Sequence, residues 1–261
     1  MTEMLLAQDR HEQEPMREVH SFVVLDLDRT ILNTDALNRQ ICERIDKSID
    51  TSPEQGDPYE FIQSQKGKAL SVAAYLDNRY GHEAYEQVTT TLAREAETPD
   101  QPRAADLIYP GVAELLAALE DNDIPYGILT YGEPANQIFK LRIFHALVKK
   151  YEGAINALVT DQQFKAQWLE SNWKESPDSE GGWFIVHPEL SSNATIKAQH
   201  IVVVDDKLEN TQSEDARIVE FVVDNDQSNP EADFQPIEQL AHLIQDGEFI
   251  AWVDKKVEQK A

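Results

Sequence analysis

Short apolar runs, each ending in polar or acidic residues, recur along the chain and alternate with stretches of helical periodicity. Continuous apolar runs predict strands that are buried on both faces, as in a parallel sheet covered by helices. Because ligands bind beyond the carboxyl ends of parallel strands, the polar residues that follow these runs should meet at one edge of the sheet. The pattern therefore predicts an α/β fold with a Rossmann-like parallel sheet flanked by helices. The five predicted strands are residues 22–25, 126–129, 155–159, 201–204 and 218–223.

Residues 35–108 interrupt this alternation and are predicted to form a helical insertion. They contain no run typical of a buried strand, while Leu37, Ile41 and Ile45 keep the spacing of one helix face. Prolines and a glycine between residues 52 and 58 predict a turn inside the insertion.

The remaining boundaries follow from composition. The first twenty residues and the last seven are polar, as expected of mobile termini. Residues 175–198 include Pro177, Gly181 and Gly182, which predicts a loop or small flap. The predicted organisation is a mobile N-terminal segment (1–20), an α/β core (21–34 with 109–254), a helical insertion (35–108) and a tail (255–261).

Charge and cysteine content exclude several classes of protein. The 261 residues include 23 basic and 48 acidic side chains, for a formal charge of −25. Such a charge repels nucleic acid phosphates and anionic lipid surfaces, so neither is an expected partner. Cys42 is the only cysteine, which excludes an intramolecular disulfide and fits a reducing cytoplasm. No stretch approaches the roughly 18 apolar residues that a membrane span needs.

Two pairs of aspartates follow two of the predicted strands. Asp26 and Asp28 are two positions apart, so their side chains should point to the same side, and Asp205 and Asp206 follow a later strand. Carboxylates this close repel one another unless a cation or hydrogen bonds compensate. Mg²⁺, which binds through one or two carboxylates plus substrate phosphate, would compensate them. The alternative interpretation is that the acids only end strands in an acidic protein.

Three segments resemble the motifs of the haloacid dehalogenase-like (HAD) hydrolase superfamily. Its first, second and fourth motifs are similar to FVVLDLDRTILNT (22–34), YGILTYG (126–132) and IVVVDDK (201–207) in sequence, order and spacing. The segment YPGVAELLAAL (109–119) is similar to the helix that re-enters the core after the cap. The resemblance covers most of residues 22–225 and implies a HAD-like core. It also implies that the insertion between motifs one and two, residues 35–108, is a helical cap domain.

The resemblance implies a Mg²⁺-dependent phosphatase that acts through an aspartyl-phosphate intermediate. Asp26 would be the nucleophile, and Asp28 would protonate the leaving oxygen and then activate water. Dehalogenases of the family typically lack the second aspartate, so Asp28 favours phosphoryl chemistry. The implied metal ligands are the Asp26 carboxylate, the Asp28 backbone carbonyl and Asp206, with Asp205 acting through water. The implied phosphate contacts are Thr130 and the amides near Tyr131 and Gly132.

The third motif of the family is a lysine, for which the sequence offers two candidates. Lys165 follows a predicted strand at the start of a helical stretch, where the family places it, although it lies forty residues before Asp205. Lys197 lies eight residues before Asp205, but a strand fills most of that gap. We expect Lys165, with Lys197 as the alternative. Lys140 is expected to be an ordinary residue of an amphipathic helix, and Arg29, where many members have glycine, either contacts substrate or points to solvent.

The expected partner is a small phosphorylated substrate, because a cap excludes bulk water and disfavours large protein substrates. A phosphomutase is the enzymatic alternative, since it shares the aspartyl-phosphate step but returns the phosphoryl group to substrate. A catalytically silent regulatory or binding protein with the same fold is the third hypothesis.

Overall fold

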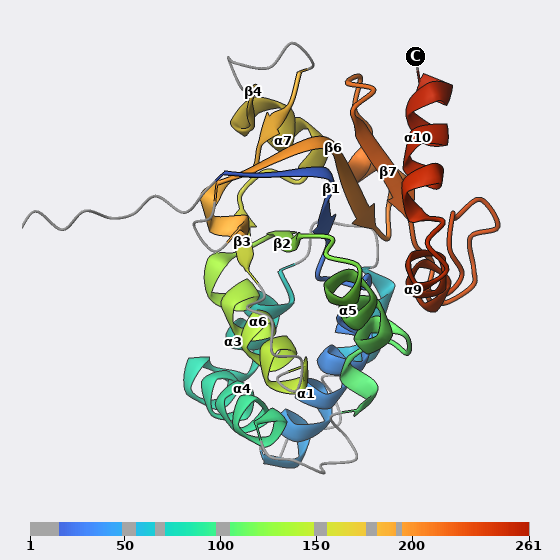
Figure 1. The fold of residues 1–261 in the computed structure, drawn as a ribbon. Coiled ribbons are helices and arrows are strands. Elements are labelled where there is room, and N and C mark those ends of the chain that lie inside the picture. The colour runs from blue at the N-terminus through green and yellow to red at the C-terminus, as the bar shows by residue number, and fades with distance from the viewer. Residues whose placement is uncertain are drawn as a thin grey trace, which may run out of the picture.

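The computed structural model describes residues 16–48, 56–65, 71–97, 105–148, 156–175, 182–191 and 195–260. Within them the chain forms one mostly parallel sheet with helices packed around it (Figure 1). No helix in these ranges is long and apolar enough to cross a membrane. The strands are β1 (Arg17–Leu25), β2 (Tyr126–Tyr131), β3 (Ala157–Thr160), β4 (Lys174–Glu175), β5 (Phe184–Ile185), β6 (Ile196–Asp205) and β7 (Ile218–Val222). The helices are α1 (Thr34–Ser48), α2 (Pro58–Ser64), α3 (Val72–Tyr80), α4 (His82–Ala96), α5 (Val112–Asp121), α6 (Pro134–Val148), α7 (Lys165–Asn172), α8 (Leu208–Thr211), α9 (Glu238–Gln245) and α10 (Phe249–Lys260), with short 3-10 helices η2 (Ala105–Leu107) and η3 (Pro188–Leu190).

The five predicted strands form the parallel part of the sheet, in the order β3-β2-β1-β6-β7. Strand β6 is long enough to pair with two different strands along the same edge. Its residues 201–205 pair with β7 in parallel, whereas Lys197 and Ala198 pair with β5 in the antiparallel direction. Strand β5 in turn pairs with β4. The predicted α/β fold is confirmed, but the sheet is mixed, because part of the segment expected to be a loop or flap forms this antiparallel extension.

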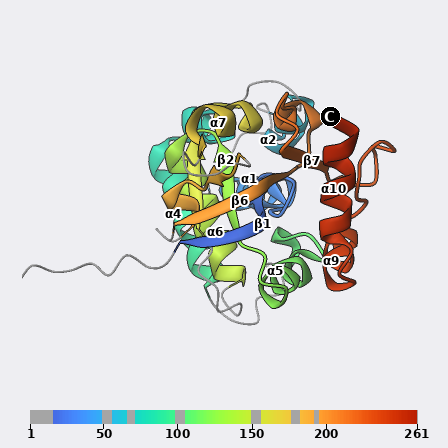
Figure 2. The ribbon, with the colours of Figure 1, turned by 45° about the horizontal axis from the view of Figure 1, so that its top comes forward.

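Both faces of the sheet are apolar, which explains the continuous hydrophobic runs. Val23 and Leu25 belong to a core with α5 and α9, whereas Phe22 and Val24 belong to a second core with α7 and η3. Figure 2 shows α7 and the α5–α9 pair on opposite sides of β1 and β6. Each buried aliphatic or aromatic side chain of this kind contributes roughly 1.5–3 kcal/mol of transfer free energy. The two cores thus fix the position of the strand ends.

Both termini of the described chain are more structured than their composition suggests. The prediction of a mobile segment over residues 1–20 is wrong for its last residues, because β1 begins at Arg17, which pairs with Ile196. Residues 1–15 lie outside the described residues. The predicted tail, 255–261, is also wrong up to residue 260, because α10 continues to Lys260, whose amino group donates to the Ile218 carbonyl at 2.7 Å.

The described part of residues 35–108 is helical, as its periodicity predicts. It contains most of α1 and all of α2, α3, α4 and η2, and no named strand within those ranges. The predicted turn falls partly on residues 51–55, outside the description, but Pro58 begins α2 and the Asp57 carboxylate caps that helix by accepting from the Tyr59 amide at 2.7 Å. Helix α4 packs against α6 of the core, so the helices lie close to the sheet's carboxyl ends (Figure 1). That this segment acts as a cap domain stays a prediction.

Candidate active site

Asp26 stands directly after β1, with its carboxylate held from two sides. Its Oδ1 lies 2.8 Å from the Lys165 amino nitrogen, and its Oδ2 accepts a hydrogen bond from the Thr30 hydroxyl at 3.1 Å. The Asp26 amide donates to the Val204 carbonyl at 2.8 Å, which ties this turn to β6. The side chain is almost fully buried. The carboxylate therefore has one fixed orientation at the end of the central strands.

Lys165, and not Lys197, is the lysine that the structure brings to the aspartates. It is the first residue of α7, and its amino group also contacts Asp205 Oδ2 at 2.5 Å. Burial opposes its charged form, but the carboxylates of Asp26 and Asp205 outweigh burial and raise the pKa of Lys165. Lys197 lies near the start of β6, paired with Glu18 of β1, at the end of the strand away from Asp205.

The Asp205–Asp206 pair divides into one enclosed and one accessible carboxylate. Asp205 is fully buried, and its Oδ1 accepts from the Lys207 amide at 2.9 Å and from the Asn210 side chain at 3.2 Å. Because Oδ2 accepts from the Lys165 amino group, both carboxylate oxygens of Asp205 have partners within the protein. Asp206 is half-buried and lines a cavity with Asp26. Sequence reasoning did not include Asn210, whose only signal was its position five residues after Asp205.

Carboxylate oxygens of Asp26, Asp205 and Asp206 lie within 4.8 Å of one another, and this crowding changes their ionisation. Burial, together with repulsion from neighbouring acids, raises the pKa of Asp26 to about 7 and the pKa of Asp206 to about 8. Either protons or a cation would relieve the repulsion. An oxygen-only donor set is the kind that hard divalent cations prefer. These residues therefore fit the Mg²⁺ ion that the sequence motifs imply.

Asp28 lies in a separate network that points toward α6. Both of its carboxylate oxygens accept from the Lys140 amino group at 2.8 Å, and Oδ1 also accepts from the Thr34 hydroxyl at 2.6 Å. The Gln137 amide donates to Oδ2 at 3.1 Å. Burial opposes ionisation of this carboxyl, but the charge and hydrogen bonds of Lys140, with those of Thr34 and Gln137, lower the pKa of Asp28.

The prediction that Lys140 is an ordinary helix residue is wrong. Lys140 is buried with only 7% of its surface exposed, and Gln137 is buried beside it. A signal for this arrangement exists in the sequence, because Gln137, Lys140, Phe144 and Val148 share one face of α6 at helical spacing. The apolar end of that face predicts burial, so its two polar residues must meet partners in the interior. Their partner, Asp28, is too distant in sequence to be inferred from the helix.

The implied phosphate contacts are only partly available. Tyr131 and Gly132 line the cavity, whereas Thr130 is fully buried and donates its hydroxyl to the Gln137 side-chain oxygen at 3.2 Å. The Gly132 amide donates to the Thr160 carbonyl at 3.3 Å. Contacts between these groups and a phosphate stay predictions. To donate to a phosphate, the Thr130 hydroxyl and the Gly132 amide would have to give up their present hydrogen bonds to Gln137 and Thr160.

The loop after Asp26 places residue 29 in a conformation that glycine adopts more readily than other residues. Arg29 has φ = 65°, a left-handed conformation that a non-glycine residue adopts at some cost. The Asn225 side chain donates to the carbonyls of Arg29 and Thr30 at 3.0 Å, which holds the loop in this shape. The Arg29 guanidinium lies 3.4 Å from Asp35 and lines the cavity.

A cavity of about 730 Å³ joins these groups to the helical segment. Arg39 and Arg79 of the helical segment are not in its lining. The strand ends contribute Asp26, Asp28, Lys165, Asp206 and Lys207, and the helical segment contributes Asp35, Asn38, Ile62, Gln63, Gln65, Ser71 and Val72.

No family model and no curated protein sequence matches this chain. Solved structures do match it. A structure described as a haloacid dehalogenase-like hydrolase from Burkholderia xenovorans LB400 is 18% identical, with a TM-score of 0.52 over 87% of this chain and 97% of the other. A HAD-hydrolase from Bacillus subtilis, bound to magnesium, is 14% identical, with a TM-score of 0.51 over 87% and 99%. Similarity at these identities concerns the fold.

Proposed function

We propose that this chain, which has the fold of the haloacid dehalogenase-like hydrolases, is a Mg²⁺-dependent phosphatase of a small phosphorylated metabolite. The observation that carries the proposal is the setting of Asp26. Its carboxylate lies at the wall of a cavity, held by Lys165 and Thr30, with the accessible carboxylate of Asp206 beside it. A fixed, partly neutralised carboxylate next to a space for substrate is what nucleophilic attack on phosphorus requires.

In the first step an Asp26 oxygen forms a bond to phosphorus while the bond from phosphorus to the substrate oxygen breaks. Asp28 gives its proton to that leaving oxygen. Water then attacks the aspartyl phosphate, Asp28 takes the proton, and the Asp26–phosphorus bond breaks to release inorganic phosphate. Lys165 keeps a positive charge beside Asp26 throughout, which stabilises the negative charge of both transition states.

Asp26 and Asp206 are the proposed metal ligands of this chain, with the Asp28 backbone carbonyl as a third. Asp205 is proposed to act indirectly, because both its oxygens already accept hydrogen bonds within the protein. When bound, Mg²⁺ would neutralise charge on the phosphoryl group and orient it. The magnesium in the Bacillus subtilis hydrolase of the same fold supports this choice of ion.

The cavity lining supports a small substrate with hydroxyl groups. The side chains of Asn38, Gln63 and Ser71 in the helical segment are neutral and polar, which suits hydrogen bonding to a polyol or sugar. Asp35 is the acidic group on that side, and Arg29 contacts it.

One observation favours a second candidate, a catalytically silent binding protein of the same fold. Asp28 is held by Lys140, Thr34 and Gln137, so its proton-transfer role requires it to leave or rearrange this network. A silent protein could keep the network permanently.

Phosphate release distinguishes the two candidates. The full chain is incubated with an aryl phosphate and with a panel of sugar and polyol phosphates, with Mg²⁺ or with chelator, and Asp26→Asn is the matched control. Mg²⁺-dependent release of inorganic phosphate that Asp26→Asn loses supports the phosphatase. Binding of a phosphate ester without turnover supports the silent protein. A phosphorylated isomer as the product indicates the phosphomutase alternative.

A further inference from the structure

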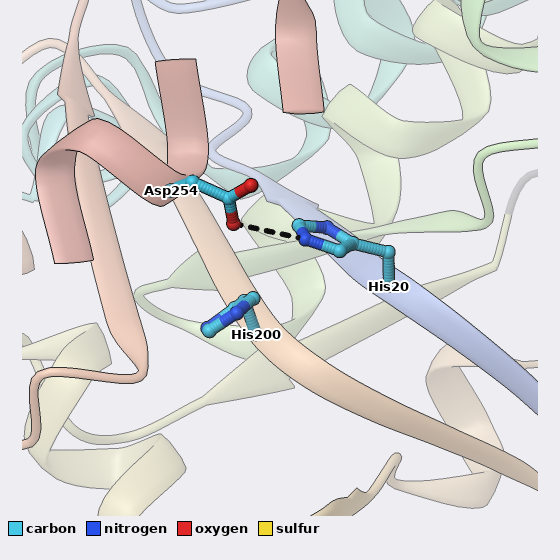
Figure 3. Close-up of side chains that lie close together, drawn as sticks. All are labelled: His20, His200 and Asp254. Atoms are coloured by element: carbon cyan, nitrogen blue, oxygen red, sulfur yellow. Dashed lines mark hydrogen bonds and ion pairs between the residues drawn. The ribbon is translucent and has the colours of Figure 1, made fainter. Parts of the chain in front are cut away.

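Two histidines and an aspartate meet far from the carboxyl ends of the strands (Figure 3). His20 comes from β1, His200 from the neighbouring strand β6 and Asp254 from α10. One nitrogen of each ring and one carboxylate oxygen all lie within 4.8 Å of one another. His20 precedes Asp26 by six residues on one strand, which is roughly 20 Å at the usual rise. The cluster is therefore separate from the candidate active site.

A shared irregularity in two strands brings the histidines together. Val19 and Phe22 contact the same apolar core although they are three residues apart, so side chains do not alternate regularly between them. Ala198 and Ile201 of β6 show the same break at the matching register. His20 and His200 lie within these breaks, with ring centroids 5.0 Å apart. The backbone of both strands is thus locally adapted to place two imidazoles side by side.

His200 has a polar atom that the protein does not satisfy. The residue is 93% buried, since its exposed fraction is 7%, and its Nδ1 has no hydrogen-bond partner among the described residues. Buried polar atoms of side chains are normally paired with protein or water, and each exception needs a reason. A ligand bound between the His200 ring, the His20 ring and the Asp254 carboxylate would give this buried imidazole a partner.

The hydrogen bonds of His20 allow its Nε2 to bind a cation. Its Nε2 lies 3.0 Å from Asp254 Oδ1, and its Nδ1 lies 2.8 Å from the Ser21 hydroxyl. When a cation replaces the proton between Nε2 and Asp254, the ring proton moves to Nδ1. The Ser21 hydroxyl, which can donate or accept, then accepts from it. Metal-bound histidines usually donate the N–H of their other ring nitrogen to an oxygen acceptor.

We propose that His20, His200 and Asp254 form a binding site for a transition-metal ion, with Zn²⁺ as the ion to test. Two imidazoles and one carboxylate are ligands that Zn²⁺ accepts, and three protein ligands leave one position for water. His20 is partly exposed and Asp254 is exposed, so the ion can enter from solvent. The site would join α10 to the two central strands.

The test is calorimetric titration of the metal-free full chain with Zn²⁺. Excess Mg²⁺ is present because Mg²⁺ prefers carboxylate ligands to imidazole and so occupies the carboxylate sites. The variants are His20→Ala, His200→Ala and Asp254→Asn. We expect the wild type to bind one Zn²⁺ that each of these three variants binds at least about tenfold more weakly. Zn²⁺ should raise the Tm of the wild type more than the Tm of these variants. Asp254→Asn and His20→Ala change exposed or partly exposed groups, so they remain informative if His200→Ala misfolds.

His82→Ala is the matched control. The His82 ring lies 3.0 Å from Asp77, and this histidine–aspartate pair on the helical segment belongs to neither three-residue cluster found among the described residues. Its removal should leave the Zn²⁺ titration unchanged. Wild-type and Asp254→Asn proteins with the same titration curve, or equal loss in His82→Ala, would overturn the proposal. Asp26→Asn should bind Zn²⁺ as the wild type does, so the outcome is independent of phosphatase activity.

Discussion

Lys140 donates to both carboxylate oxygens of Asp28 at 2.8 Å, so the proposed acid–base residue is ion-paired with a helix of the core. Ion pairing stabilises the charged carboxylate, which is the form that accepts a proton from water. The same pairing disfavours the protonated form that the leaving oxygen needs. Lys140 thus sets the balance between the two halves of the proposed reaction.

Replacement of Lys140 should move the pH profile of phosphate release. In Lys140→Met the main group that lowers the pKa of Asp28 is lost, so Asp28 stays protonated to higher pH. The alkaline limb of kcat/KM is expected to shift upward, while Lys140→Arg keeps the wild-type limb. Measurement of kcat/KM from pH 3 to 9 checks this, because the pKa of Asp28 in the wild type lies below its ordinary value of 3.8. An unchanged limb in Lys140→Met would argue against control by Lys140.

Asp26→Asn should abolish turnover and leave the fold intact. The amide cannot accept the phosphoryl group, while Lys165 keeps Asp205 as a partner. We expect phosphate release below about 1% of wild type, given the losses that follow removal of a nucleophile. Circular dichroism and a thermal melt confirm folding of the variant. Retained release above that level would remove Asp26 from its proposed role.

Lys165→Ala and Lys197→Ala should differ strongly. Loss of Lys165 removes the fixed positive charge beside Asp26, and we expect at least a roughly hundredfold loss of rate, as for other preorganised charge-stabilising groups. Lys197→Ala, near the other end of β6, should retain nearly full rate. Single-turnover kinetics on folded protein provide the measurement. Comparable losses in the two variants would contradict the assignment.

Mg²⁺ should be required, and Ca²⁺ should inhibit. Ca²⁺ takes more oxygen ligands than Mg²⁺ and can bind both oxygens of Asp26, which leaves neither free for in-line attack. Phosphate release is measured after metal removal and after addition of each ion, alone and in competition. Full activity in excess chelator would rule out the metal requirement.

The metal-free protein should lose stability as pH rises. The pKa of Asp26 is about 7 and that of Asp206 about 8 in the folded protein, both above the ordinary value of 3.8. The folded state therefore binds more protons, and its free energy of unfolding falls between about pH 4 and pH 8. Thermal melts across this range test the direction. Mg²⁺ should raise Tm most at pH 8, and Asp206→Asn should flatten the pH dependence.

The strands that carry the site can be predicted from the sequence because they are buried on both faces. Phe22–Leu25 and Ile201–Val204 are short, have no polar position and are rich in valine, which favours buried strands with the aspartates at their ends. Strand β1 extends to Arg17 without such a pattern, because its first residues are exposed or half-buried and are held by backbone pairing to β6. Pairing of that kind depends on the partner strand and leaves no trace in the hydrophobic pattern.

The Asp28 network is harder to predict than the Asp26 site. Asp26 and Lys165 follow strands whose positions are known from the pattern, whereas the contact of Lys140 with Asp28 depends on how α6 packs beneath the loop. Similarly, the meeting of His20, His200 and Asp254 depends on two strand irregularities and one helix position. Each requires the tertiary arrangement, and neither has a local spacing rule.

The pairing of β1 with β6 has a consequence for how the chain folds. Eight of the nine residues of β1 pair with one 179 positions later, as in Arg17 with Ile196 and Leu25 with Val204. Contacts this distant require the closure of a very long loop, which slows folding. During synthesis β1 is made before the other strands but lacks its β6 neighbour until residue 205 has left the ribosome. We expect Phe22–Leu25 to be the segment of the nascent chain that most needs protection from aggregation.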